Sequence, residues 1–130
     1  MFDEIYYKNL NKPAITPPNY VFRYVWYLLY ILMFFALTIV IFSPNSMVKF
    51  FGILFFILQL VLNIIWAPVF FKLRKMKLSL IICIFLTVFA LVSLYFFSKV
   101  SLFAFFLMFP YILWLFFACF LLANIVSMNN

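Results

Sequence analysis

The sequence predicts an all-α integral membrane protein built as a bundle of four transmembrane helices. Of the 130 residues, 72% are hydrophobic and only 8% are charged, whereas a soluble domain of this length is about half apolar and a quarter charged. The charged residues leave four uncharged stretches between them, each long enough to cross the hydrocarbon core, which takes about 20 apolar residues. None of these stretches alternates apolar with polar residues as the strands of a membrane β-barrel do.

The four predicted spans cover roughly residues 20–42, 50–71, 78–97 and 102–125. The connections between them are short. The first contains a Ser-Pro-Asn turn signal, the second is the basic segment KLRKMK, and the third, SKVS, is little more than a turn. Short connections place consecutive helices antiparallel and side by side, so residues 1–130 are expected to form a single membrane domain.

The distribution of basic residues predicts the orientation in the membrane. With four spans, the N-terminus, the second connection and the C-terminus share one side. Basic residues on that side are Lys8, Lys12, Arg23, Lys72, Arg74, Lys75 and Lys77, and the opposite side has Lys49 and Lys99. By the positive-inside rule both termini are expected in the cytoplasm, in a bacterial inner membrane. The basic connection is interpreted as this topology signal with lipid headgroup contacts; an anionic ligand or lipid site is the alternative.

The composition excludes most catalytic chemistry. Histidine is absent, and Asp3 and Glu4 are the only acids, so the usual residues for acid–base catalysis and for catalytic triads are missing. Cys83 and Cys119 each lie inside an apolar run and are interpreted as small packing residues rather than as a disulfide or metal site. No metal, no required cofactor and no nucleic-acid partner are expected, and the partner that the composition implies is the lipid bilayer.

The stretch LQLVLNIIWAPVFF carries two amides and a proline in an otherwise apolar span. Gln59, Asn63, Trp66 and Phe70 are spaced 4, 3 and 4 residues apart, which places them on one face of a helix. A single intramembrane amide usually ties helices together and contributes about 1 kcal/mol or less. Two amides one turn apart, followed by an indole, also fit a polar-lined cavity. On these residues alone, helix packing and a ligand pocket remain equally open.

Aromatic residues recur at helical spacing in the first and last spans. Phe22, Trp26 and Tyr30 lie four apart, and Trp114 and Ala118 lie four apart near the middle of the last span. A deep tryptophan is unusual, because this residue favours the membrane interface where its N–H stays hydrated. The ladder in the first span is interpreted as a packing or lipid-facing feature, with a ligand wall as the alternative.

Three segments together resemble the TspO/MBR (translocator protein) family. The family pattern KP…PP…F..VW..LY is matched by residues 12–30, Q..LN..W.P.FF by residues 59–71, and PY..W...A by residues 110–118, in the same order and with the same spacing. The resemblance covers nearly the whole chain. It implies a membrane bundle of five helices around a pocket that binds porphyrins, haem and hydrophobic drug-like ligands.

Carried over position by position, the resemblance implies a set of ligand-binding residues. They are Tyr7, Trp26, Tyr30, Asn63, Trp66, Trp114 and Ala118. A porphyrin is a flat aromatic plate that packs against indole faces, and its nitrogens and propionates need a few polar partners. Lys8, Lys12 or Arg23 would meet a propionate at the mouth of the pocket.

The chain departs from the family pattern at its N-terminus. Family members carry a helix before the KP…PP segment, and this chain begins close to that segment. The four spans are therefore expected to correspond to helices 2–5 of the five-helix fold, without the first. Either translation starts further upstream, or this is a shortened member whose pocket is open or completed by a partner. A homodimer that buries the open pocket wall against a second copy is expected in the latter case.

Three functions are consistent with the sequence. The favoured one is a membrane receptor or carrier that binds tetrapyrroles or similar lipophilic ligands. The second is a light-dependent porphyrin-degrading enzyme that would use Trp26 and Trp114; otherwise no catalytic residue is assigned. The third is a structural or regulatory membrane protein that has lost its pocket. The scarcity of titratable groups favours binding over ordinary catalysis.

The charge distribution makes a prediction about topology. A reporter enzyme that is active only after export, fused after Asn130, should remain inactive, because the basic side of the bundle stays in the cytoplasm. The same reporter inserted in the first connection, residues 43–49, should be active. Activity of the C-terminal fusion would reverse the assigned orientation.

Overall fold

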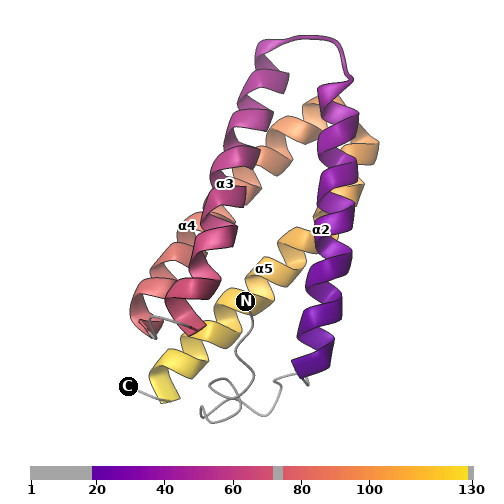
Figure 1. Cartoon of the computed structure of the whole chain (residues 1–130). Coiled ribbons are helices and arrows are strands. Elements are labelled where there is room, and N and C mark those ends of the chain that lie inside the picture. Colours follow the sequence, from indigo (N-terminus) through magenta and orange to yellow (C-terminus); the bar gives the residue numbers. More distant parts are fainter. Residues whose placement is uncertain (1–18, 72–74, 129–130) are drawn as a thin grey trace.

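The computed structural model describes residues 19–71 and 75–128, which form four helices joined by short connections (Figure 1). They are α2 (Asn19–Ile41), α3 (Met47–Phe71), α4 (Met76–Val100) and α5 (Leu102–Met128). All four are long and apolar enough to cross a membrane, so the predicted all-α fold with four spans is confirmed. The helix α4 is longer than its predicted range of 78–97, because charges such as Lys77 and Lys99 end the hydrocarbon-crossing stretch without ending the helix.

Each helix buries residues along one side and exposes large side chains on the opposite side. The buried positions recur every three or four residues, as expected when one face of an α-helix packs against its neighbours. The stripes are Leu29, Met33, Ala36 and Val40 on α2; Phe56, Gln59, Asn63, Ala67 and Phe70 on α3; Cys83, Leu86, Ala90 and Phe97 on α4; and Ala104, Met108, Tyr111 and Leu115 on α5. The exposed side chains are mostly large and apolar, which suits contact with lipid tails rather than with water.

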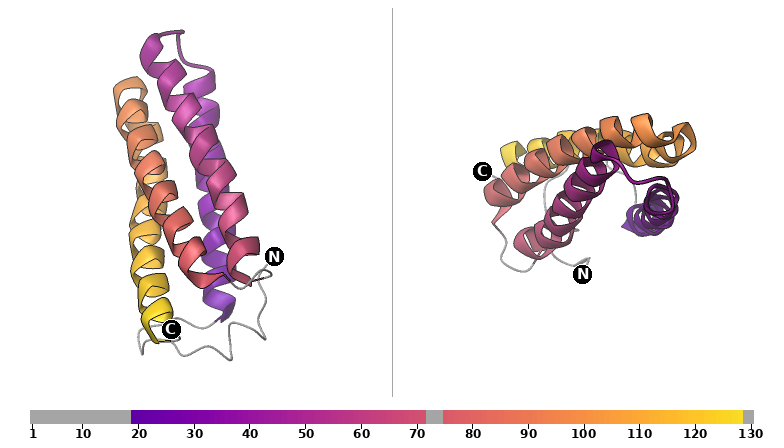
Figure 2. Two further views of the ribbon diagram at one scale, coloured as in Figure 1. Left: turned by 90° about the vertical axis from the view of Figure 1, so that its left-hand side faces the viewer. Right: turned by 90° about the horizontal axis from the view of Figure 1, so that it is seen from above.

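The helices do not share equal interfaces. The pair α3–α4 packs most extensively, followed by α4–α5 and α2–α5, and of the consecutive helices α2 and α3 share the smallest interface. Seen from above, α2 stands apart from α3 although the two are consecutive in the chain (Figure 2). Helix α2 is therefore held mainly through α5. The start of α2, the end of α3, the start of α4 and the end of α5 lie at one end of the bundle (Figure 1).

The close approach of α3 and α4 depends on Gly52. A Cβ atom at this position would lie 3.0 Å from the Phe97 ring and 3.2 Å from the Phe96 Cβ. The Ser93 hydroxyl also donates a hydrogen bond to the Gly52 carbonyl across the same interface (3.1 Å). Small residues allow helix backbones to approach each other in membranes, and the absent side chain at Gly52 provides the space that the Phe97 ring occupies.

The connection between α2 and α3 is held by Lys49. Its ammonium group donates hydrogen bonds to the carbonyls of Ile41 (2.6 Å) and Ser43 (2.8 Å) and to the Asn45 side-chain oxygen (3.2 Å). The last carbonyls of a helix have no partner within the helix. A cation at the C-terminal end of α2 satisfies two carbonyls there and interacts favourably with the helix dipole.

Enlarging Gly52 should weaken the α3–α4 interface. We expect Gly52→Leu to lower the free energy of unfolding by about 1–3 kcal/mol, because the added side chain must displace the Phe97 ring from a packed site. Reversible unfolding in mixed micelles of mild detergent and dodecyl sulfate measures this change. Val61→Phe adds comparable bulk to an exposed position of α3 and serves as the control. Equal stability of the two variants would contradict the packing role of Gly52.

Candidate functional site

The three tryptophans of the chain come together around Trp26. The Trp26 ring lies 6.2 Å from Trp66 and 6.3 Å from Trp114, measured between centroids. It also contacts Tyr30 at 6.1 Å and Tyr111 at 6.4 Å. Centroid separations of 4.5–7 Å with tilted or edge-to-face rings are favourable aromatic contacts. We call these five residues the aromatic cluster.

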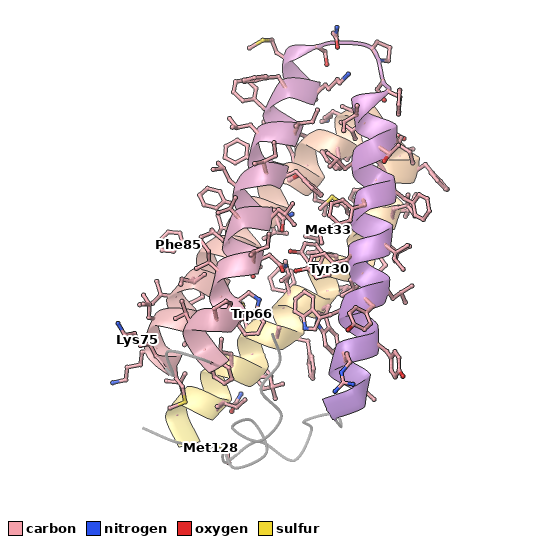
Figure 3. All side chains as sticks on the ribbon, viewed as in Figure 1. Tyr30, Met33, Trp66, Lys75, Phe85 and Met128 are labelled. Atoms are coloured by element: carbon pink, nitrogen blue, oxygen red, sulfur yellow. The ribbon has the colours of Figure 1, made fainter. Side chains whose placement is uncertain are left out.

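Three different helices supply the aromatic cluster. Trp26 and Tyr30 come from α2, Trp66 from α3, and Tyr111 and Trp114 from α5. The two residues from α2 are four positions apart and the two from α5 are three positions apart, so each pair lies on one face of its helix. Figure 3 shows Tyr30 directed from α2 toward the middle of the bundle, and Trp66 on the side of α3 that faces α2 and α5. All three indoles are half-buried, so the cluster has both a packed side and an accessible side.

A chain of hydrogen bonds continues from the aromatic cluster into the membrane interior. The Tyr30 hydroxyl donates to Asn63 Oδ1, and Asn63 Nδ2 donates to the Tyr111 hydroxyl (2.7 Å). The Tyr111 hydroxyl donates to Gln59 Oε1 (2.5 Å), and Gln59 Nε2 contacts Met33 Sδ at 3.5 Å. The chain therefore runs from α2 to α3, to α5, back to α3 and again to α2. Every link joins two different helices.

Burial makes these hydrogen bonds important for the fold. Gln59 and Tyr111 are fully buried, and Asn63 is 1% exposed. A buried amide without a partner costs free energy, and no water is present in the bilayer core to replace one. The carbonyl oxygens of both amides accept a tyrosine hydroxyl hydrogen, and their amino groups donate onward. The sequence left two interpretations of the amides open, helix packing and a ligand pocket. In this structure Gln59 and Asn63 act in helix packing, because their hydrogen bonds join α3 to α2 and α5.

Five of the seven residues expected in the ligand site meet at this place. Trp26, Tyr30, Asn63, Trp66 and Trp114 are linked by ring contacts or hydrogen bonds. Ala118 is half-buried and lies one helical turn after Trp114 on the same side of α5, without a polar group of its own. Tyr7 lies outside the described residues, as do Lys8 and Lys12, so their positions relative to the cluster stay a prediction.

The expected ligand-binding residues did not include Tyr111, Gln59 or Met33, although the sequence placed Gln59 on the same helix face as Asn63 and Trp66. Tyr111 is the residue that joins the aromatic cluster to both amides. It stands three positions before Trp114, in the segment PYILW, and this spacing places both on one face of α5. A tyrosine deep in a span needs a partner for its hydroxyl, so this spacing was the available signal. No comparable signal identifies Met33, because a methionine in an apolar span has no special pattern.

The site offers ring faces, amides and hydroxyls rather than charges. Within residues 19–71 and 75–128, no three histidine, cysteine or acidic side chains come together in a way that could hold a metal ion. The nearest basic side chain along α2 is Arg23, which is exposed and lies one turn before Trp26, toward the end of the bundle where Lys75 and Lys77 are also exposed. This arrangement suits a flat apolar ligand with an anionic edge.

Comparisons with known proteins find a matching family and several similar sequences. The family model described as "TspO/MBR family" matches residues 2–128 of the chain. The "Tryptophan-rich protein TspO" of Chlorobaculum tepidum is 33% identical over 127 residues, which are 95% of this chain and 79% of the relative. The "Tryptophan-rich sensory protein" of Cereibacter sphaeroides is 33% identical over 109 residues, 84% of this chain and 67% of the relative. A TspO of Archaeoglobus fulgidus is 36% identical over 88% of this chain and 74% of the relative.

Removing the Tyr111 hydroxyl should destabilise the bundle. We expect Tyr111→Phe to lower the free energy of unfolding by about 1–2 kcal/mol, because it leaves Asn63 Nδ2 and Gln59 Oε1 buried without that partner while it keeps the ring. Reversible unfolding in mixed micelles measures the change. Tyr27→Phe, which removes an exposed hydroxyl from α2, is the matched control. A Tyr111→Phe variant as stable as this control would show that the hydrogen-bond chain contributes little to the fold.

Proposed function

The chain belongs to the TspO/MBR family, and from this premise we propose that it is a membrane receptor that binds a tetrapyrrole, such as porphyrin or haem, against the aromatic cluster. Family membership supports a receptor or sensor role in the membrane, and the relative from Cereibacter sphaeroides is named "Tryptophan-rich sensory protein". The observation that carries the finer proposal is the convergence of Trp66 and Trp114 on Trp26 from three separate helices.

The chemistry of the cluster fits a tetrapyrrole. The ligand is a large flat aromatic ring, and tilted indoles from separate helices offer it faces and edges on more than one side. Its propionates need cations, and Arg23 lies one turn beyond Trp26 toward the end of the bundle. Lys75 and Lys77 are exposed at the same end. A tetrapyrrole with its ring against the aromatic cluster and its propionates toward this end of the bundle would contact both the indoles and the basic residues.

The small interface between α2 and α3 indicates where the ligand would enter. The ring contacts of Trp26 with Trp66 and Trp114 fill the space between them in this structure, so a flat ligand must part at least one pair. Helices α2 and α3 share the smallest interface between consecutive helices. Parting Trp26 from Trp66 therefore disrupts less packing than parting α3 from α4. The hydrogen bond from Tyr30 to Asn63 would hold the middle of the two helices together meanwhile.

The membrane context completes the proposal. The four spans place the protein in a lipid bilayer, and the distribution of basic residues supports the proposal that both termini lie in the cytoplasm. A second copy packed against the side of the bundle between α2 and α3 would form a homodimer and would cover the accessible side of the aromatic cluster. Helix α2 offers exposed apolar side chains for such a contact, including Tyr27, Ile31 and Phe34.

Ligand binding should be visible in the intrinsic fluorescence. All three tryptophans of the chain belong to the cluster, and porphyrin absorption overlaps indole emission. We expect a saturable loss of nearly all the fluorescence when protoporphyrin is titrated into the purified protein in detergent. Trp26→Phe and Trp114→Phe should each weaken binding by about 1–2 kcal/mol, roughly 5- to 30-fold, through lost aromatic contact.

A control and a contrary outcome make this measurement decisive. Phe106→Leu changes an exposed aromatic residue of α5 that does not belong to the cluster, and it should leave the affinity unchanged. Binding in the tryptophan variants is followed by the porphyrin absorption band, so the loss of an indole does not remove the signal. Unsaturable quenching, or equal affinities for all variants, would mean that the cluster does not bind the tetrapyrrole.

A further inference from the structure

Two cysteines far apart in the sequence face each other in the structure. Cys83 of α4 and Cys119 of α5 are both free thiols. They are separated by 36 residues, and their sulfur atoms lie 2.9 Å apart. The sequence indicates two separate packing residues. It does not predict their contact, because the contact arises only when α4 packs against α5.

The hydrogen bonds around the two thiols can be assigned by counting hydrogens. The Thr87 hydroxyl has one hydrogen and donates it to the Cys83 carbonyl (2.8 Å). At the 3.2 Å contact between Thr87 Oγ1 and Cys119 Sγ, the Cys119 thiol must therefore be the donor. Its sulfur is then the acceptor of the Cys83 thiol hydrogen. Cys83 S–H thus points at the sulfur of Cys119.

The two cysteines differ in how accessible they are. Cys83 is 2% exposed and belongs to a core cluster with Ala67, Phe70, Leu121, Leu122 and Ile125. Cys119 is half-buried and packs against the edge of the same cluster. Trp66 and Trp114 also pack against this cluster. A small neutral oxidant in the bilayer would therefore reach the Cys119 thiol before the Cys83 thiol. An oxidised Cys119 would lie in the cluster against which Trp66 and Trp114 pack.

We propose that Cys83 and Cys119 form a reversible redox pair that a hydroperoxide converts to a disulfide between α4 and α5. In the first step the Cys119 sulfur attacks one oxygen of hydrogen peroxide, the O–O bond breaks, and Cys119 becomes a sulfenic acid as one water leaves. In the second step the Cys83 sulfur attacks the Cys119 sulfur and the S–O bond breaks. The leaving hydroxyl takes the Cys83 proton and departs as a second water.

The geometry suits the second step in particular. A disulfide needs its sulfurs about 2.05 Å apart, so the two side chains must approach by less than 1 Å. The Cys83 hydrogen already points toward the sulfur from which the hydroxyl departs. A dithiol reductant reverses the reaction by thiol–disulfide exchange and is itself oxidised to a disulfide. The oxidised state would fix α5 to α4 beside Trp114, in the half of the bundle that carries the aromatic cluster.

The wild-type protein tests the main claim. Purified protein in mild detergent is treated with hydrogen peroxide, and its intact mass is measured before and after. We expect a monomer lighter by two hydrogens, a lower tryptophan fluorescence, and a melting temperature raised by roughly 5 °C or more through the added cross-link. Dithiothreitol should reverse all three changes. An unchanged mass, or a disulfide that joins two chains, would overturn the proposal.

Single variants test the order of the two steps. Cys83→Ser removes the resolving thiol, so the sulfenic acid on Cys119 should persist and be trapped by dimedone as a stable adduct. Cys119→Ser leaves only the buried Cys83 and should give little adduct under the same treatment. Thr87→Val, which removes the hydroxyl but keeps the shape, should still form the disulfide. Equal trapping in the two cysteine variants would contradict the assigned roles.

Discussion

The bilayer interior contains no water, and this constraint explains why the chain of hydrogen bonds from Tyr30 to Met33 exists at all. Two amides and two hydroxyls in the spans must find their partners inside the protein. They do so by alternating between helices, so each satisfied group also fixes one helix against another. These links matter most for the attachment of α2 to α3, because the two helices otherwise share only a small interface. Two of the hydrogen bonds join them, from Tyr30 to Asn63 and from Gln59 to Met33.

The position of the aromatic cluster follows from the position of α2. Trp26 lies one turn before Tyr30, so the hydrogen bond that holds Tyr30 against Asn63 also sets where the Trp26 ring lies between α3 and α5. Tyr111 belongs to both arrangements, as a hydrogen-bond partner of the amides and as a ring in contact with Trp26. The proposed ligand site and the hydrogen-bond chain therefore share residues. A substitution in the site must be tested for both effects before either is assigned.

The core is divided into two parts that meet at the tryptophans. The larger buried cluster includes residues from all four helices and surrounds the hydrogen-bond chain. The smaller one lies toward the end of the bundle where α3 ends and α4 begins, and it contains Cys83. Trp66 and Trp114 pack against both clusters. A change in the smaller cluster, such as a covalent link between α4 and α5, is thus placed to alter the surroundings of the indoles.

The sequence by itself determined the four apolar spans and their approximate limits. A membrane span requires a long uncharged apolar run, and this signal is local, so it can be read without knowledge of the neighbours. Spacing likewise placed Gln59, Asn63 and Trp66 on one face of α3, because helical periodicity is also local. The family motifs added which residues to expect in the ligand site, and five of these seven come together in the structure.

Only the tertiary structure decided which faces meet. The partners of the amides, the role of Tyr111, the contact of Met33 with Gln59 and the approach of the two cysteines all join residues at least 26 positions apart. Such contacts depend on how the helices are rotated and offset against each other, and the apolar composition around each helix does not specify this. Two constraints select one arrangement of the helices. Helices must approach at small residues such as Gly52, and buried polar groups must find partners. Other rotations or offsets would produce steric clashes or leave polar groups unsatisfied in a medium without water.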